Sequence, residues 1–324
     1  MRKYILKRLL IMIPMLLGIT IVSYLIMDLA PGDAITSMID PEKLGVMTNE
    51  QIIEARAKLG LDQPVIIRYF KWLGQILQGN FGYSYVTNGY IMDEIRGRIT
   101  VTVMISLVSM LVSIVAGIAL GVLCAVKQYK WQDYLISTFS FIGFSVPSFF
   151  LSMVVILVFS IKLGWFPAVG LRSLFVKNLT PWQSFLDMAH HCVLPIFVYS
   201  VSSIGSWARL QRASFLEVKN QDYVRTAISK GMSNAVVNFR HILRNASLPI
   251  LTSIGGCVPA LVSGSFIVES IFGIPGLGAY GTNAILNRDY PVVMATLFFS
   301  AILVMLGNLL SDILYSVVDP RIRY

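Results

Sequence analysis

The chain has 324 residues, of which 56% are hydrophobic and only 13% are charged, and its mean hydropathy is +0.71. Soluble domains carry about 25% charged residues, so this composition excludes an ordinary soluble protein and predicts an integral membrane protein. The net charge of +9 is compatible with nucleic-acid binding, but the basic residues stand beside apolar stretches, as in cytoplasmic loops of membrane proteins. We therefore expect contact with membrane lipid and none with nucleic acid.

Six apolar stretches are long enough to cross a bilayer as helices, for which about 20 residues are needed. They cover residues 9–29, 101–126, 134–161, 192–213, 248–271 and 292–317. The first stretch follows a basic start but is longer than the roughly 7–15 apolar residues of a signal peptide, so residues 1–29 are expected to be an uncleaved first span. The sequence predicts an all-α membrane protein with six transmembrane helices and both termini on one side.

The basic residues of the short loops set the expected orientation. Lys and Arg cluster near residues 2–8, 127–130, 209–244 and 321–323, whereas the alternate short loops hold only Lys162, Arg172, Lys177 and Arg288. The long loop 30–100 is left out of this comparison because long loops cross the membrane largely regardless of charge. Because Lys and Arg accumulate on the cytoplasmic side, both termini, including the tail 318–324, are expected to be cytoplasmic.

The long loop at residues 30–100 is expected to be helical and extracellular. Thr48 and Gln51 have the spacing of a capping box, which predicts a helix ending near Leu59. A second helix is expected from Pro64 to about Leu77, with most apolar residues on one face. Two interpretations stay open: an amphipathic helix on the outer membrane surface, or a docking surface for an extracellular partner.

Residues 214–247, hereafter the charged segment, interrupt the apolar pattern with seven charges: Glu217, Lys219, Asp222, Arg225, Lys230, Arg240 and Arg244. Each charge costs about 2.5–3.5 kcal/mol at a membrane centre, so the sum is on the order of 20 kcal/mol and the segment must lie in water. We expect Asp222 to cap a helix that stops at Gly231, and Ser233 to cap a second helix over residues 235–247. Such a stiff element passes a rigid-body push from a cytosolic protein to spans four and five.

The motifs in and around this segment resemble a known family. Arg225-Thr226-Ala227-x-x-x-Gly231, followed by Leu248-Pro249, resembles the EAA loop of ABC-transporter permeases, and the longer string from Asp222 looks like the oligopeptide/dipeptide branch, which also contains nickel permeases. Similar to that branch are further motifs along the whole chain: Pro31-Gly32-Asp33, Gly79-Asn80-Phe81-Gly82-Tyr83-Ser84, Val268-Glu269, Pro275-Gly276-Leu277-Gly278, Arg288-Asp289-Tyr290-Pro291 and Asp319-Pro320-Arg321.

The resemblance implies a type I ABC importer permease fold with a core at residues 101–317, in the plasma or inner membrane of a bacterium or archaeon. It implies half of a translocation path for di- or oligopeptides, completed by a second homologous permease in a heterodimer. Two ATPase subunits would carry the ATP and Mg²⁺, an extracellular solute-binding protein would deliver substrate, and this chain would bind no cofactor or metal. A nickel, metal-chelate or glutathione importer of the same family is the alternative.

The resemblance also implies functional residues. ATPase coupling is expected at Asp222, Tyr223, Arg225, Thr226, Ala227, Lys230 and Gly231. Arg225 departs from the acidic first position of the general motif, so an ion pair from that position to the ATPase is not assumed. The translocation path or gate is expected at Ser263, Phe266, Glu269, Pro275 and Gly276, and residues 274–278 are expected to form a tight turn or re-entrant wedge.

Other function classes fit the sequence less well. An intramembrane enzyme is disfavoured because no Ser/His, paired-Asp or HExxH arrangement lies inside the spans. A self-sufficient channel is the third hypothesis. The GxGxxG pattern at Gly276 lies between two apolar spans rather than between a strand and a helix, and no phosphate-binding GxxxxGK[ST] occurs. His190 and His191 are adjacent, but no third metal ligand stands at a recognisable spacing.

Overall fold

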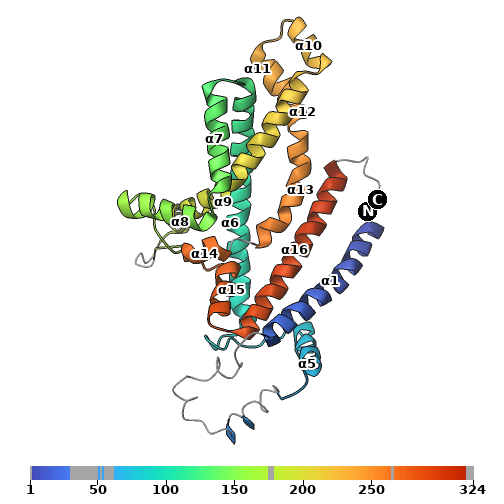
Figure 1. Ribbon diagram of the computed structural model, residues 1–324, viewed down its shortest axis with the longest axis vertical. Helices are drawn as coiled ribbons and strands as arrows, with labels where there is room; N and C mark the ends of the chain where they lie inside the picture. The colour runs from blue at the N-terminus through green and yellow to red at the C-terminus, as the bar shows by residue number, and fades with distance from the viewer. Residues whose placement is uncertain are drawn as a thin grey trace. The chain divides into compact units, whose positions relative to one another are not determined.

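The structure is a computed structural model that describes residues 2–29, 50–51, 53–54, 62–173, 179–263 and 266–318. Over these ranges the chain is helical, and an isolated antiparallel bridge joins Tyr83 to Tyr90. The helices (Figure 1) are α1 Arg2–Leu29, α5 Val65–Leu77, α6 Ile91–Val126, α7 Trp131–Ser145, α8 Ser148–Val155, the π-helix η1 Ile156–Lys162, α9 Pro181–Lys219, α10 Asp222–Ser229, α11 Asn234–Val236, the π-helix η2 Val237–Ile242, α12 Leu243–Ala246, α13 Leu248–Ser263, α14 Phe266–Ile271, α15 Leu277–Leu286 and α16 Tyr290–Val318.

Four helices within the described ranges are long and apolar enough to cross a membrane: α1, α6, α9 and α16. A fifth is added if α7 and the α8–η1 pair form one broken span. Helix α9 begins well before the predicted residue 192 because Thr180 and Gln183 form a complete capping box ahead of Pro181 at the first helical position. Apolar periodicity alone does not detect such a polar first turn.

The apolar stretch predicted as a span over residues 134–161 is not one straight helix. Helix α7 ends at Ser145, α8 begins at Ser148, and the two directions differ by 108°. Val146 and Pro147 have extended backbone angles, with ψ of 123° and 138°. Proline disfavours a helical conformation in the residue before it and donates no backbone hydrogen bond, so Pro147 breaks the helix here.

Other sequence expectations have mixed outcomes. The helix expected from Pro64 to Leu77 is confirmed as α5, with Pro64 at its N-cap. The capping box at Thr48, the helix end near Leu59 and the tail beyond Val318 lie outside the described residues. The predicted span 248–271 appears as α13 and α14, and residues 264–265 between them are also outside the described part.

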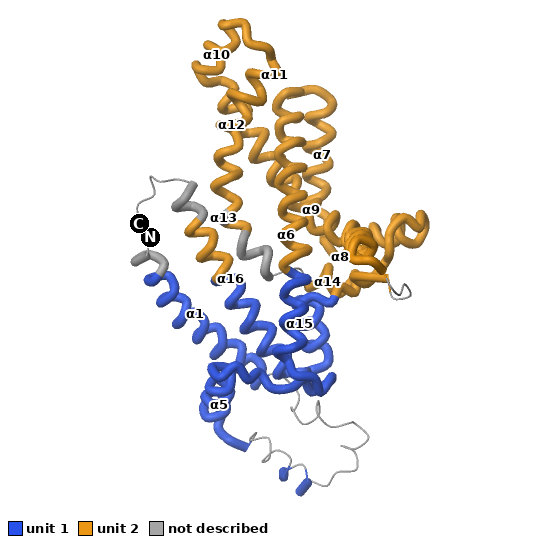
Figure 2. Tube along the Cα trace, turned by 180° about the vertical axis from the view of Figure 1, so that it is seen from behind, with its two compact units in different colours: residues 1–102, 275–305 blue, residues 103–274, 306–324 orange. Residues whose placement is uncertain are grey.

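The chain divides into two compact units (Figure 2). Unit 1 consists of residues 1–102 and 275–305, and unit 2 of residues 103–274 and 306–324. Residues of the predicted extracellular loop, including α5, thus share a unit with α15, which follows them by about two hundred positions in the sequence.

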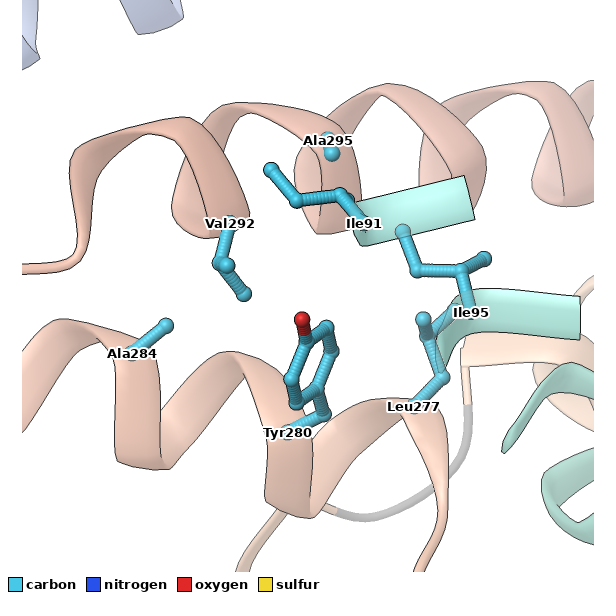
Figure 3. Close-up of a cluster of buried hydrophobic side chains, with 7 residues drawn as sticks. All are labelled: Ile91, Ile95, Leu277, Tyr280, Ala284, Val292 and Ala295. Carbon is cyan, nitrogen blue, oxygen red and sulfur yellow. The ribbon is translucent and has the colours of Figure 1, made fainter. Parts of the chain in front are cut away.

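Unit 1 has a small core that joins three helices (Figure 3). Its buried members come from the start of α6, from one face of α15 and from the start of α16: Ile91, Ile95, Leu277, Tyr280, Ala284, Val292 and Ala295. The backbone N–H of Leu277 donates to Oγ1 of Thr102 at 2.9 Å. Residues 274–278 were expected to form a tight turn or re-entrant wedge, but Leu277 and Gly278 are the first two residues of α15. The sequence did not predict this packed helix.

Unit 2 is built on close contacts between helix backbones. A Cβ atom added to Gly205 of α9 would lie 2.8 Å from the carbonyl oxygen of Ser140 in α7. A Cβ added to Gly121 of α6 would lie 2.6 Å from Cβ of Gln211 in α9. Small residues allow helices to approach closely in membrane proteins, and these glycines hold α6 and α7 against α9.

Candidate functional site

The charged segment forms two helical pieces about a glycine turn, as predicted. Helix α9 extends to Lys219, α10 follows at Asp222–Ser229, and Gly231 has a left-handed φ of +79°. Ser233 caps the next helix by accepting a hydrogen bond from the N–H of Val236 at 3.5 Å. The N-cap of α10 is Gln221, so the expected cap at Asp222 is wrong: Asp222 is the first helical residue, where its carboxylate faces the positive end of the helix dipole.

The second helical piece is not a uniform α-helix. It runs through α11, η2 and α12, with the π-helical turn over Val237–Ile242, and α13 begins directly after it at Leu248. Within this piece Val237 and Ile242 are buried, whereas Phe239 is 65% exposed. In a π-helical turn the angle between successive residues differs from that in an α-helix. Apolar residues at α-helical spacing therefore do not all lie on one face here.

The inner face of α10 is anchored on two long helices. Val224 and Ala227 are 0% and 5% exposed, and they join a core that includes Phe215 of α9 and Ala125 of α6. The same core contains Val237, Ile242 and Ala246 of the second piece. The sequence predicts that this segment passes a push to spans four and five, and that transmission stays a prediction. In the structure the segment shares its core with α9, the fourth apolar stretch, and α12 also contacts α13. The presence of α6, the second apolar stretch, in this core is a feature that the sequence did not indicate.

Helix α10 lies at one end of unit 2 (Figure 2), and its outer face is open to solvent. The side chains of Asp222 and Arg225 are 98% and 73% exposed and lie 3.8 Å apart, a surface pair of little energetic value. Thr226 and Lys230 are exposed as well. Tyr223 is 44% exposed, and its hydroxyl accepts a hydrogen bond from Nδ2 of Asn245 at 2.9 Å, which ties α10 to α12.

The predicted coupling residues therefore divide by direction. Asp222, Arg225, Thr226 and Lys230 face outward, Gly231 forms the turn, and Ala227 lies in the core. The sequence analysis missed Ile228 and Met232, which are 54% and 40% exposed beside the charged residues. Single exposed apolar side chains are common on protein surfaces, so Ile228 and Met232 are candidates for a partner contact only because they lie beside the exposed charged residues of α10. The sequence contains the spacing that reveals this. Val224 and Ala227 are three residues apart and share the buried face of α10, so Ile228 next to them points outward.

The residues expected to form a path or gate are described only in part. Phe266 is 37% exposed and Glu269 is 1% exposed, both in α14 of unit 2. Pro275 and Gly276 precede α15 in unit 1, with Gly276 at its N-cap. The side chain of Ser263 lies outside the described residues. Their role in a path or gate stays a prediction.

The two adjacent histidines make separate contacts with backbone carbonyls. Nε2 of His190 lies 2.8 Å from the carbonyl oxygen of Trp165, and Nδ1 of His191 lies 2.8 Å from that of Asp187. Over the described ranges, no three His, Cys, Asp or Glu side chains are grouped so as to hold a metal ion.

Two family models together match nearly the whole chain. The binding-protein-dependent transport system inner membrane component matches residues 117–324, and the N-terminal part of that membrane component matches residues 1–107. The boundary between the matches lies inside α6, so the two families meet within one helix.

Similar curated proteins cover the chain from end to end. The oligopeptide transport system permease protein AppB of Bacillus subtilis is 44% identical, with 100% of both chains aligned. A putative peptide permease protein of Brucella ovis is 38% identical over 100% of this chain and 99% of its own. The glutathione transport system permease protein GsiC of Escherichia coli K12 is 37% identical, again over 100% of both. With its apolar helices and its solvent-exposed charged segment, this chain belongs to the family of binding-protein-dependent transport system inner membrane components, as a multi-pass transmembrane permease subunit of an ABC importer.

Proposed function

We propose that residues 221–232 are the docking surface for a cytosolic ATPase subunit, and that α10 passes the movement of that ATPase to α6 and α9. The observation that carries the proposal is that α10 is buried on one side and exposed on the other. Val224 is fully buried against unit 2, whereas the side chain of Arg225 next to it is 73% exposed. A helix that is packed on one side and open on the other transmits a push as a rigid body, because packed cores deform little.

The proposed topology has six spans with both termini in the cytoplasm. Helices α1, α6, α9 and α16 supply four, α7 with α8–η1 supplies a broken fifth, and α13 with α14 supplies the sixth. The concentration of Lys and Arg in alternate short loops supports this orientation. The bacterial sources of the similar proteins support placement in the plasma or inner membrane of a bacterium or archaeon.

The proposed complex contains a second homologous permease, two ATPases that carry ATP and Mg²⁺, and an extracellular solute-binding protein. The family description, which names dependence on a binding protein, supports this set. The proposed substrate is a di- or oligopeptide, supported by the name of the 44% identical relative. Glutathione is the second candidate because a 37% identical relative is named for it, and it is itself a small peptide.

The docking proposal is tested by copurification of the ATPases with tagged permease in mild detergent. The double variant Arg225→Glu, Ile228→Asp changes two outward side chains and leaves the core beneath them intact. We expect most of the bound ATPase to be lost while the melting temperature of the permease is unchanged. Ala227→Glu, which places a carboxylate in the core, is expected to lower the melting temperature as well.

The matched control reverses a charge elsewhere. Lys162 is exposed at the end of η1, on the proposed external side, so Lys162→Glu should retain the ATPase. Full ATPase binding and ATP-driven transport by the Arg225→Glu, Ile228→Asp variant would show that the docking surface lies elsewhere.

A further inference from the structure

Helix α5 has an apolar face that no described part of the chain covers. Ile66, Phe70 and Leu77 are 70%, 63% and 80% exposed. At 3.6 residues per turn these three side chains fall within about 40° of one another around the helix axis, so they form one stripe. Full burial of such side chains is worth about 1.5–3 kcal/mol each, which is a substantial cost if the stripe faces water.

A second face of α5 packs against α1. Tyr69 and Ile76 are buried, and Tyr69 and Trp72 contact Tyr24 of α1, with ring centroids 5.5 and 5.7 Å from that of Tyr24. The hydroxyl of Tyr69 also lies 3.0 Å from Oγ1 of Thr20. The orientation of α5 about its own axis is therefore fixed by α1, and the exposed stripe is a separate face.

The third face of α5 is polar and lies roughly opposite the stripe. It carries Arg68, Lys71 and Gln75, whose directions average about 150° away from the stripe at 3.6 residues per turn. Lys71 and Gln75 are exposed. A helix with an apolar stripe, a polar face opposite and a protein contact between them has the arrangement of a helix lying in a membrane interface beside a spanning helix.

The depth of α5 relative to α1 supports the same placement. Nη2 of Arg68 lies 2.5 Å from Oδ1 of Asp28, in the last turn of α1. An ion pair is costly within hydrocarbon, so this pair marks the end of the apolar part of the α1 span. The aromatic group of Tyr24, Tyr69 and Trp72 lies just beside it, and Tyr and Trp collect at the membrane interface.

We propose that α5 lies in the interfacial layer of the bilayer, with Ile66, Phe70 and Leu77 inserted among lipid acyl chains and Lys71 directed to headgroups or water. The occupant of the stripe is lipid because α1, to which α5 is fixed, presents a lipid-type surface: only 11% of its most apolar stretch is buried in this chain, and Ile26 and Leu29 are 65% and 81% exposed. The inference rests on α1 crossing the membrane and is independent of the ATPase docking proposal.

Site-directed spin labelling tests the insertion. Phe70→Cys and Lys71→Cys are neighbours on different faces, and each is labelled in a background in which Cys124, Cys192 and Cys257 are replaced by Ser. The labelled permease is studied with its copurified subunits in phosphatidylethanolamine/phosphatidylglycerol nanodiscs. Power saturation compares collisions with oxygen, which concentrates in lipid, and with the nickel complex Ni-EDDA, which stays in water.

The expected result is a ratio of oxygen to Ni-EDDA collisions several-fold higher at position 70 than at position 71. A label at position 70 that collides freely with Ni-EDDA would mean that the stripe faces water, and it would overturn the proposal. A label at position 70 shielded from both reagents would also overturn it, because a protein subunit would then cover the stripe. Since the readout needs no ATP, a failure of ATPase docking leaves it unaffected.

Discussion

Two single-residue features shape the charged segment and its support. Gly231 has a φ of +79°, and a Cβ atom added there would meet nothing within 4 Å. The requirement for glycine is therefore one of backbone conformation and not of space. Close to the segment, Arg212 of α9 donates through Nε and Nη2 to the two carboxylate oxygens of Asp133 in α7, each at 2.8 Å.

Replacing Gly231 by Ala is expected to destabilise the turn by about 1–2 kcal/mol, the cost of a left-handed conformation for an L-residue. The two helical pieces would then sample other relative orientations, and ATPase copurification should fall. Gly79 is a matched control, since its φ is +78° and its Cβ position is equally open. Gly79→Ala should lower the melting temperature by a similar amount yet retain the ATPase, and equal ATPase binding by both variants would contradict the prediction.

The Asp133–Arg212 pair predicts an asymmetric mutational result. The side chain of Asp133 is 5% exposed and that of Arg212 is 29% exposed. Removing one partner of a buried pair costs about 3–5 kcal/mol because a charge is left uncompensated, and the more buried charge suffers more. Arg212→Met should therefore lower the melting temperature more than Asp133→Asn, and the double variant should recover part of the loss of Arg212→Met. The check is thermal unfolding in one detergent; additive losses would show that the charges are not coupled.

At the scale of elements, unit 1 depends on a carboxylate that joins a loop to a helix. Asp289, 3% exposed just before α16, accepts hydrogen bonds from Ser84 Oγ at 2.5 Å and from the N–H of Tyr85 at 3.1 Å. Burial, and then the charge of Asp289, raises the pKa of Tyr85. This contact unites two motifs of the family resemblance, one ending at Ser84 and the other beginning at Arg288.

Asp289→Ala is expected to release the loop over residues 84–87, because the hydroxyl of Ser84 and the N–H of Tyr85 lose their acceptor. Hydrogen–deuterium exchange of the loop amides should accelerate by an order of magnitude or more, since a lost hydrogen bond to a charged group is worth about 1.5–3 kcal/mol. Exchange in α10, which belongs to unit 2, serves as the internal control. Unchanged exchange at residues 84–87 would indicate that the loop is held by other contacts.

At the scale of the whole molecule, the chain is a permease subunit, and the proposed transport cycle needs other chains. In the proposed cycle, the ATPases dock on α10 and a binding protein delivers the peptide. The alternatives at this scale are a glutathione importer, a metal-chelate importer and a self-sufficient channel. They differ in the solute that moves and in whether ATP is required.

The permease alone in liposomes is expected to give no solute flux, whereas the complete complex with its binding protein should accumulate labelled peptide only when ATP is present. The measurement compares uptake and ATP hydrolysis with a peptide library, glutathione and nickel chelates in parallel. Peptides are expected to stimulate hydrolysis most. Flux through the isolated chain would favour the channel, and stimulation by nickel chelates alone would reassign the substrate.

The sequence by itself determined the membrane class, most of the apolar helices and the turn at Gly231. These features depend on residues that are close together in the chain. The membrane class follows from the hydropathy of about twenty successive positions and the placement of the charged segment from the cost of its seven charges. The turn follows from the conformational freedom of one glycine. The cap at Ser233 is confirmed for the same reason, because a side-chain cap involves only residues three positions apart. It also identified the family, because motifs are strings in chain order.

Only the tertiary structure decided which surfaces and pairs exist. Pro147 stands in the sequence as a helix breaker, but the 108° change of direction between the two halves is known only from the structure. The sequence around Ala227 does not show that this residue is buried; only the core that α10 shares with α6, α9 and η2 does. The pairs Asp133–Arg212 and Ser84–Asp289 join residues 79 and 205 positions apart. Such contacts arise from the packing of distant helices, and no local sum over the sequence contains that information.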